Sequence, residues 1–101
     1  MRIAILAAGL ITAATNASAM DCGEFVKIHS FLSRAQFQCG FSKYATNMMA
    51  QAKECGSTMS EAKLDEGLAA GIKLFDTREA ERGHKQMCSD VLKSFPQAVA
   101  R

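Results

Sequence analysis

Four cysteines are the residues of this 101-residue chain with the clearest capacity for chemistry: Cys22, Cys39, Cys55 and Cys88. Zinc ribbons and thioredoxin-like redox sites need closely spaced pairs such as C-x-x-C, and the chain has no such pair. An even number of widely spaced cysteines in a short exported chain is typical of structural disulfides. We therefore expect two disulfides, no metal site and no catalytic thiol.

The amino-terminal residues have the three parts of an export signal in order. Met1-Arg2 gives a positive start, residues 3–11 are apolar but too short to span a bilayer, and Ala17-Ser18-Ala19 is an A-x-A cleavage site. The alternative is an amino-terminal helix that stays in the fold. We predict a signal peptide over residues 1–19, cleaved after Ala19, and a single domain over residues 20–101 in the periplasm or outside the cell.

The residues around the first cysteine bear on membrane attachment. A lipoprotein signal places small residues directly before the acylated cysteine, whereas Met20 and Asp21 precede Cys22. No later stretch is apolar enough to span a bilayer. The net charge of +2 falls to +1 when Arg2 leaves with the signal. We therefore expect no lipid anchor, no transmembrane segment and no nucleic-acid partner.

His84 is the candidate for pH sensing. It falls in an apolar stripe near a charged stretch, where a partly buried imidazole could titrate between neutral and acid pH. The alternative is a packed histidine with one hydrogen bond. No Ser/His/Asp or Cys/His arrangement, paired carboxylates or phosphate-binding loop accompanies it, so we predict no catalytic residue, no enzyme activity and no cofactor.

Four further residues are candidates for an interface or a groove. Val26 and Phe37 fall on the polar side of the first predicted helix, where they are either exposed or contact another element or a partner. Gly67 and Gly71 are one helical turn apart, and glycine costs about 0.5–1 kcal/mol inside a helix. Close packing against a neighbouring helix would offset that cost, and a ligand groove is the alternative.

These residues must be positioned by helices, because apolar residues recur at +3 and +4 and strand alternation is absent. We predict helices over about 23–37, 41–55 and 59–75, and a fourth from 76 to about 95. Thr58 and Glu61 form a capping box, and Asp76 is the predicted cap of the fourth helix. Gly83 could bend or break that helix, and a frayed tail is expected from about residue 96.

Helix length restricts the disulfide pairing. A helix rises about 1.5 Å per residue, so cysteines at opposite ends of one helix are roughly 24 Å apart, while a disulfide needs Cα atoms within about 7 Å. Cys22 with Cys39 and Cys39 with Cys55 are excluded on this ground. The remaining pairing is Cys22–Cys55 with Cys39–Cys88, and it predicts an all-α bundle of about four helices held by two disulfides.

The mature chain resembles small four-cysteine exported proteins of alphaproteobacteria. The resemblance is carried by Cys22, Cys39-Gly40-Phe41, Tyr44, Cys55, Gly71, Phe75, Glu81-Arg82-Gly83, Cys88 and Phe95-Pro96. It implies a periplasmic location and supplies no activity and no site residues. In architecture the chain is also similar to the small helical acid-stress chaperones of the periplasm, from which it departs by having four cysteines instead of two.

Taken together, these patterns favour a non-enzymatic exported protein that binds a protein partner, as a stress chaperone or as an inhibitor or immunity protein. The alternative is a small carrier of an apolar ligand held between helices near the two glycines and the methionines. A hydrolase or metal-dependent enzyme is the least favoured class. The sequence leaves the oligomeric state open.

Overall fold

The computed structural model describes residues 21–101 and shows four helices and one short pair of strands. The elements are α2 (Cys22–Cys39), β1 (Lys43–Tyr44), α3 (Thr46–Ser57), α4 (Glu61–Arg82), α5 (His84–Ser94) and β2 (Val99–Ala100). The predicted signal peptide, with its cleavage after Ala19, lies outside the described residues. The all-α prediction is confirmed.

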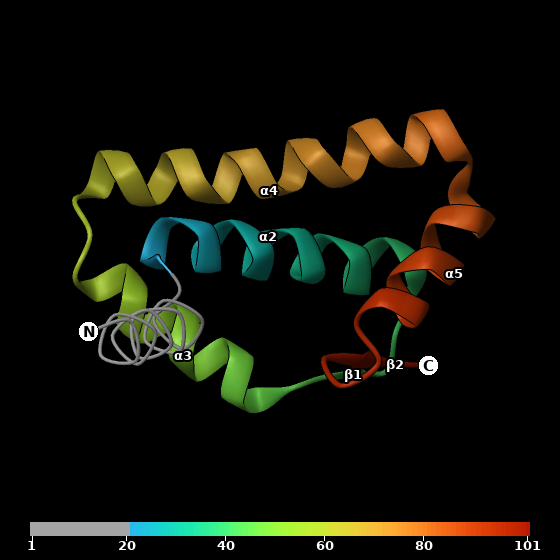
Figure 1. The fold of residues 1–101 in the computed structure, drawn as a ribbon, viewed down its shortest axis with the longest axis horizontal. Helices are drawn as coiled ribbons and strands as arrows, with labels where there is room; N and C mark the ends of the chain where they lie inside the picture. Colours follow the sequence, from blue (N-terminus) through green and yellow to red (C-terminus); the bar gives the residue numbers. More distant parts are fainter. Residues whose placement is uncertain (1–20) are drawn as a thin grey trace, which may run out of the picture.

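The central helix is α2, which lies between α4 and α3 (Figure 1). The chain turns back after α2, so α3 runs antiparallel to it, and α4 then runs parallel to it. Two side-chain hydrogen bonds establish the parallel direction of α2 and α4. Arg34 bonds to Asp76 and Gln38 bonds to Glu79, so the residue numbers rise in the same direction along both helices. Helix α5 crosses the far end of α2 (Figure 1).

Both predicted disulfides are confirmed, and they join at the two ends of α2. Cys22, the first residue of α2, is bonded to Cys55 near the end of α3, with 5.2 Å between Cα atoms. Cys39, the last residue of α2, is bonded to Cys88 in α5, with 5.6 Å between Cα atoms. Within residues 21–101 no cysteine is free.

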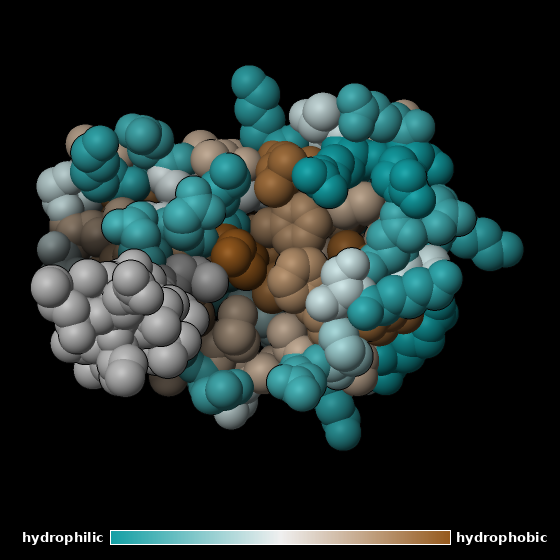
Figure 2. Space-filling model, in the orientation of Figure 1, coloured by the Kyte–Doolittle hydropathy of each residue, from teal (hydrophilic) through white to brown (hydrophobic). Residues whose placement is uncertain are grey.

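The core fills the space between the second half of α2, the second half of α4 and α5. Phe75 and Leu32 are fully buried there, and the ring of Phe31 packs edge-on against that of Phe75 at 5.8 Å between centroids. Burial of a large apolar side chain contributes about 1.5–3 kcal/mol, so each of these side chains adds appreciably to the packing energy. On the face shown in Figure 2, apolar side chains gather at the centre and are bordered by hydrophilic ones.

Helices α4 and α2 approach each other closely at Gly71, where α4 meets the backbone of α2. A Cβ at this position would lie 2.3 Å from the carbonyl oxygen of Lys27 and 2.7 Å from the amide nitrogen of Phe31. The Ser30 hydroxyl donates a hydrogen bond across the same contact to the carbonyl of Leu68. Gly71 is therefore required by close packing, and a ligand could not fit between these helices here.

Two predicted helix starts are wrong, because the side chains expected to cap them bind other groups, one on a distant residue and one on a nearby carbonyl. The Asp76 carboxylate accepts from the Arg34 guanidinium at 3.0 Å, so it does not cap a new helix, and α4 continues to Arg82. The break comes at Gly83, whose φ of 90° is unfavourable for any residue with a Cβ. The cap at the start of α4 is Ser60, while the Thr58 hydroxyl donates to the carbonyl of Cys55.

The second predicted helix starts later than expected, and the predicted frayed tail is ordered. Residues 43–44 form β1 and pair antiparallel with β2, in the register Lys43 with Ala100 and Tyr44 with Val99. Ala98 and Val99 are buried at 8 % and 3 % exposure, because the chain end covers one side of the core. The pairing draws residues 41–45 out of the helix that their local pattern predicts.

The contact at Gly71 gives a stability prediction. Gly71→Ala should lower the free energy of unfolding by about 1–3 kcal/mol, because the methyl group would overlap the α2 backbone, which cannot move aside as a side chain can. Gly67→Ala is the matched control. Its Cβ would meet a Val26 methyl at 3.2 Å, and the helix gains about 0.5–1 kcal/mol from the loss of glycine, so its net effect should be small. Urea unfolding of both variants measures the difference, and equal midpoints would contradict the assigned close approach.

Candidate binding site

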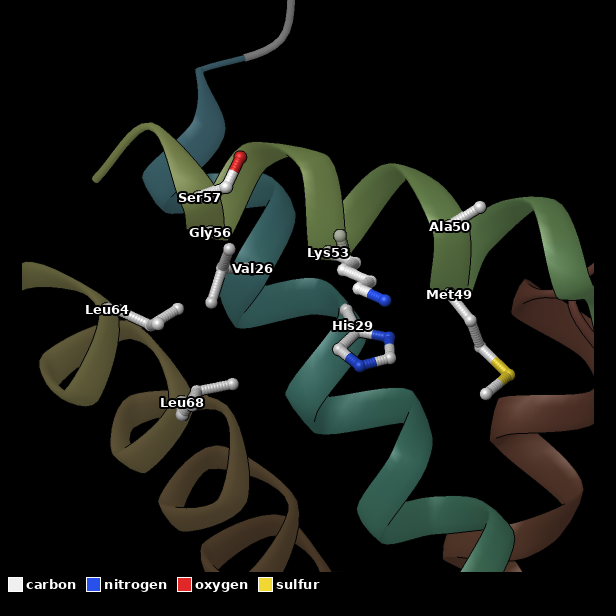
Figure 3. A pocket seen from close by; sticks show the side chains of 10 residues that line it. Val26, His29, Met49, Ala50, Lys53, Gly56, Ser57, Leu64 and Leu68 are labelled. Atoms are coloured by element: carbon white, nitrogen blue, oxygen red, sulfur yellow. The ribbon is translucent and has the colours of Figure 1, made fainter. Parts of the chain in front are cut away.

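An apolar pocket of about 590 Å³ lies between three helices, over the first half of α2 (Figure 3). Helix α2 forms the floor, and α3 and α4 form the two walls. The lining is mostly apolar or small, with two basic side chains: Val26, His29, Met49, Ala50, Ala52, Lys53, Gly56, Ser57, Leu64 and Leu68. The volume falls in the range of about 300–1,000 Å³ that is typical of small-molecule sites.

The pocket forms because α3 and α4 approach each other at only one end. That end is beside the Cys22–Cys55 disulfide, where a Cβ on Gly56 would lie 3.3 Å from a Leu64 methyl. From there the two helices diverge, since α3 turns toward β1 while α4 continues along α2 (Figure 1). The result is a trough that is closed at the disulfide end and open toward the middle of α2.

Val26 contacts another element of the fold, which is one of the alternatives that the sequence left open for it. Its side chain is 1 % exposed, because Gly67 on α4 lies directly against it and it forms the floor of the pocket. The helical periodicity places Val26 among the polar residues of α2. The burial comes from the close approach of α4, which only the tertiary structure shows.

Phe37, in contrast, is 77 % exposed. Residues 26 and 37 differ by eleven positions, or about three helical turns, so they share one face of α2. The close contact with α4 covers this face only at its beginning. Phe37 therefore lies at the open end of the same face that carries the pocket, and about 16 Å from Val26 along the helix axis.

Two more large apolar side chains are exposed in the part of the chain that the structure describes, namely Met49 at 50 % and Ile72 at 42 %. Met49 is on the α3 wall of the pocket. Ile72 is one turn after Leu68, a residue of the α4 wall, so it extends that wall. The exposed apolar residues Phe37, Met49 and Ile72 thus come from three helices and, together with the pocket, form what we call the apolar face.

The polar groups at the pocket come from α2 and α3. Nδ1 of His29 is 2.7 Å from the Tyr44 hydroxyl, and the two rings stack with centroids 5.6 Å apart. Burial lowers the pKa of His29 and raises the pKa of Tyr44 to about 12, so both groups are held in their neutral forms near pH 7. Lys53 is the one lining residue that is charged at that pH, and sequence reasoning did not single out either Lys53 or His29.

His84 does not lie in this site. It begins α5 at the opposite end of the molecule, and its side chain is 62 % exposed, so the expected partial burial is not observed. Its Nδ1 is 2.6 Å from a Glu79 carboxylate oxygen, and Nε2 is 3.9 Å from the disulfide sulfur of Cys88. The role of pH sensor stays a prediction for His84, whereas His29 is the histidine that packing places in a partly buried environment.

The two candidate glycines do not open a groove for a ligand between α2 and α4. Gly71 is filled by the α2 backbone, and Gly67 contacts Val26 across the same interface. Gly67 borders a separate depression of about 660 Å³, which is lined mainly by polar and charged side chains. The apolar cavity lies on the side of α2 where α3 and α4 diverge.

Among residues 21–101, no group of three or more histidine, cysteine or acidic side chains is placed to hold a metal ion. None of the helices in the same region is both long and apolar enough to cross a membrane.

Comparison with known proteins gave no relative from which a role could be transferred. No protein-family model matches the chain, and neither the curated proteins nor the solved structures contain a match.

The environment of His29 predicts a loss of stability in acid. The unfolded chain binds a proton on this histidine below about pH 6.5, whereas the folded chain resists protonation because the charged form is desolvated. The contribution of neutral His29 to the free energy of unfolding is therefore complete above about pH 6.5. It is lost as the pH falls through the lower pKa that His29 has in the folded state.

His29→Gln should reduce the decrease in melting temperature between about pH 7.5 and about pH 5. Thermal unfolding followed by circular dichroism measures it. His84→Gln is the comparison, because it removes the other histidine. A larger reduction in His84→Gln than in His29→Gln would assign the acid sensitivity to the exposed histidine instead.

Proposed function

We propose that this chain is an exported, non-enzymatic protein that binds a protein partner through the apolar face. The observation that supports this most directly is the position of Phe37, Met49 and Ile72. They are the large apolar side chains that are exposed in residues 21–101. Met49 lines the trough, and Phe37 and Ile72 lie farther along α2 and α4, the helices that form its floor and one wall. Grouped exposed apolar residues with a polar surround are typical of protein-binding surfaces.

The chemistry of these side chains suits a protein partner. Phe37 offers a large aromatic surface, and aromatic residues and methionine are enriched in protein interfaces. Met49 is unbranched and adapts to different partner shapes. Such a surface serves both forms of the proposal, a stress chaperone with many clients or an inhibitor or immunity protein with one.

Export to an oxidising compartment, the periplasm or the cell exterior, is part of the same proposal. Two disulfides are present, and disulfides persist in such compartments but are rare where thiols are kept reduced. The amino-terminal signal pattern and the resemblance to alphaproteobacterial exported proteins support the same location.

A second candidate, a carrier of an apolar ligand, has one observation in its favour. The apolar pocket between α2, α3 and α4 is closed at one end and lined by Val26, Leu64 and Leu68, so it could hold a hydrocarbon chain out of water.

Site-specific photo-crosslinking in the producing cells tests the protein-binding proposal. Replacing Phe37 with a benzophenone amino acid preserves an aromatic side chain and should give covalent adducts. The double variant Met49→Asp, Ile72→Asp should abolish those adducts, because charge on the apolar face opposes its burial. One adduct of defined mass indicates an inhibitor or immunity protein, and many adducts indicate a chaperone.

The matched control carries the same crosslinker at Lys85, which is exposed on α5. Circular dichroism checks that each variant remains folded. Adducts that form equally at positions 37 and 85, or that persist in the double variant, would refute a specific role for the apolar face.

A further inference from the structure

We propose that the apolar pocket between α2, α3 and α4 binds an alkyl-chain carboxylate, with the hydrocarbon chain against Val26, Leu64 and Leu68 and the carboxylate between Lys53 and His29. This inference rests on the carrier form of the proposed function and names its ligand class. It commits to a free fatty-acid anion as the occupant.

The shape of the pocket favours a chain over a bulky group. The trough closes where Gly56 approaches Leu64, and its floor is the buried Val26. Apolar side chains from α2 and α4 converge at this closed end (Figure 3). A flexible hydrocarbon chain can fill such a blind end, whereas a partner helix, about 10 Å in diameter, would lie across the opening without reaching the floor.

The positive charge of Lys53 favours a ligand whose head group is negatively charged. The lining contains no aspartate, glutamate or arginine, and Lys53 is its one lysine. The Lys53 amino group points across the cavity toward the His29 ring (Figure 3). None of the ion pairs formed within residues 21–101 involves Lys53. A ligand anion beside it would gain a charge-assisted hydrogen bond, which is stronger than a neutral one.

His29 supplies the second group at the same place. Its Nδ1 is within hydrogen-bonding distance of the Tyr44 hydroxyl. When that hydroxyl donates to Nδ1, the neutral imidazole carries its proton on Nε2, and Nε2 becomes a donor. Lys53 and His29 would then present two donors from different helices to the two oxygens of one carboxylate.

Titration calorimetry with dodecanoate, used below its micelle concentration, tests this inference on the folded, disulfide-bonded protein. Dodecylammonium has the same chain with the opposite charge and should bind at least about tenfold more weakly. Lys53→Gln should raise the dissociation constant for dodecanoate by about tenfold, because it removes the charge-assisted bond. Lys85→Gln makes the same charge change on α5 and should leave the affinity unchanged.

Amide chemical shifts locate the ligand independently of affinity. Dodecanoate should perturb Gly56 and Leu68 in the pocket and leave α5 unperturbed. The inference is overturned if dodecanoate does not bind, if dodecylammonium binds equally well, or if Lys53→Gln behaves like Lys85→Gln. Binding of a peptide carboxylate in place of dodecanoate would also overturn it, since the occupant would then be a protein terminus.

The two proposals can fail separately. If dodecanoate does not bind but specific adducts form at position 37, the fatty-acid inference is refuted and the protein-binding proposal stands. Fatty-acid binding without specific adducts would leave the chain as a carrier alone.

Discussion

The fixed ends of α2 are the constraint on which the rest of the structure depends. Its first and last residues are both half-cystines, so one end is joined to α3 and the other to α5. Each bridge can contribute about 2–4 kcal/mol by restricting the unfolded chain, which is substantial for a domain with a small core. The longest helix, α4, has no disulfide and is held by packing at Gly71 and by polar pairs such as Arg34 with Asp76.

This arrangement explains why one face of α2 is covered at its beginning and open at its end. The first disulfide holds the end of α3 against the start of α2, and α4 approaches α3 at the same place. Farther along, α3 has diverged toward the strand pair, and the second disulfide draws α5 to the core side of α2. Val26 and Phe37 therefore have opposite exposures although they share a helix face.

The sequence was sufficient for features that depend on a single rigid element. Helical periodicity predicts the helical class, and the length of a helix excludes two of the three disulfide pairings. Gly71 is likewise predicted to mark close packing, since the free-energy cost of a glycine inside a helix must be offset. These inferences need no knowledge of which other segment lies nearby.

The errors at Asp76 and at the chain end arose where a distant segment takes part. Asp76 has the local pattern of a helix cap, but Arg34, 42 residues away, binds its carboxylate. The chain end has the composition of a frayed tail, but it pairs with residues 43–44 and buries Val99. His29 and Lys53 become neighbours at one cavity only after α2 and α3 are joined, so no spacing along the chain could identify them.

The order of the cysteines along the chain has a consequence for proteolysis. Backbone and disulfides together form a closed loop through Cys22, Cys39, Cys88 and Cys55, with the segment 39–55 running across it. A protease that cuts once anywhere between Cys22 and Cys88, for example at the exposed Gly83, therefore releases no fragment. The cleaved molecule stays in one piece until a reductant is added, so a single cut need not disperse the fold.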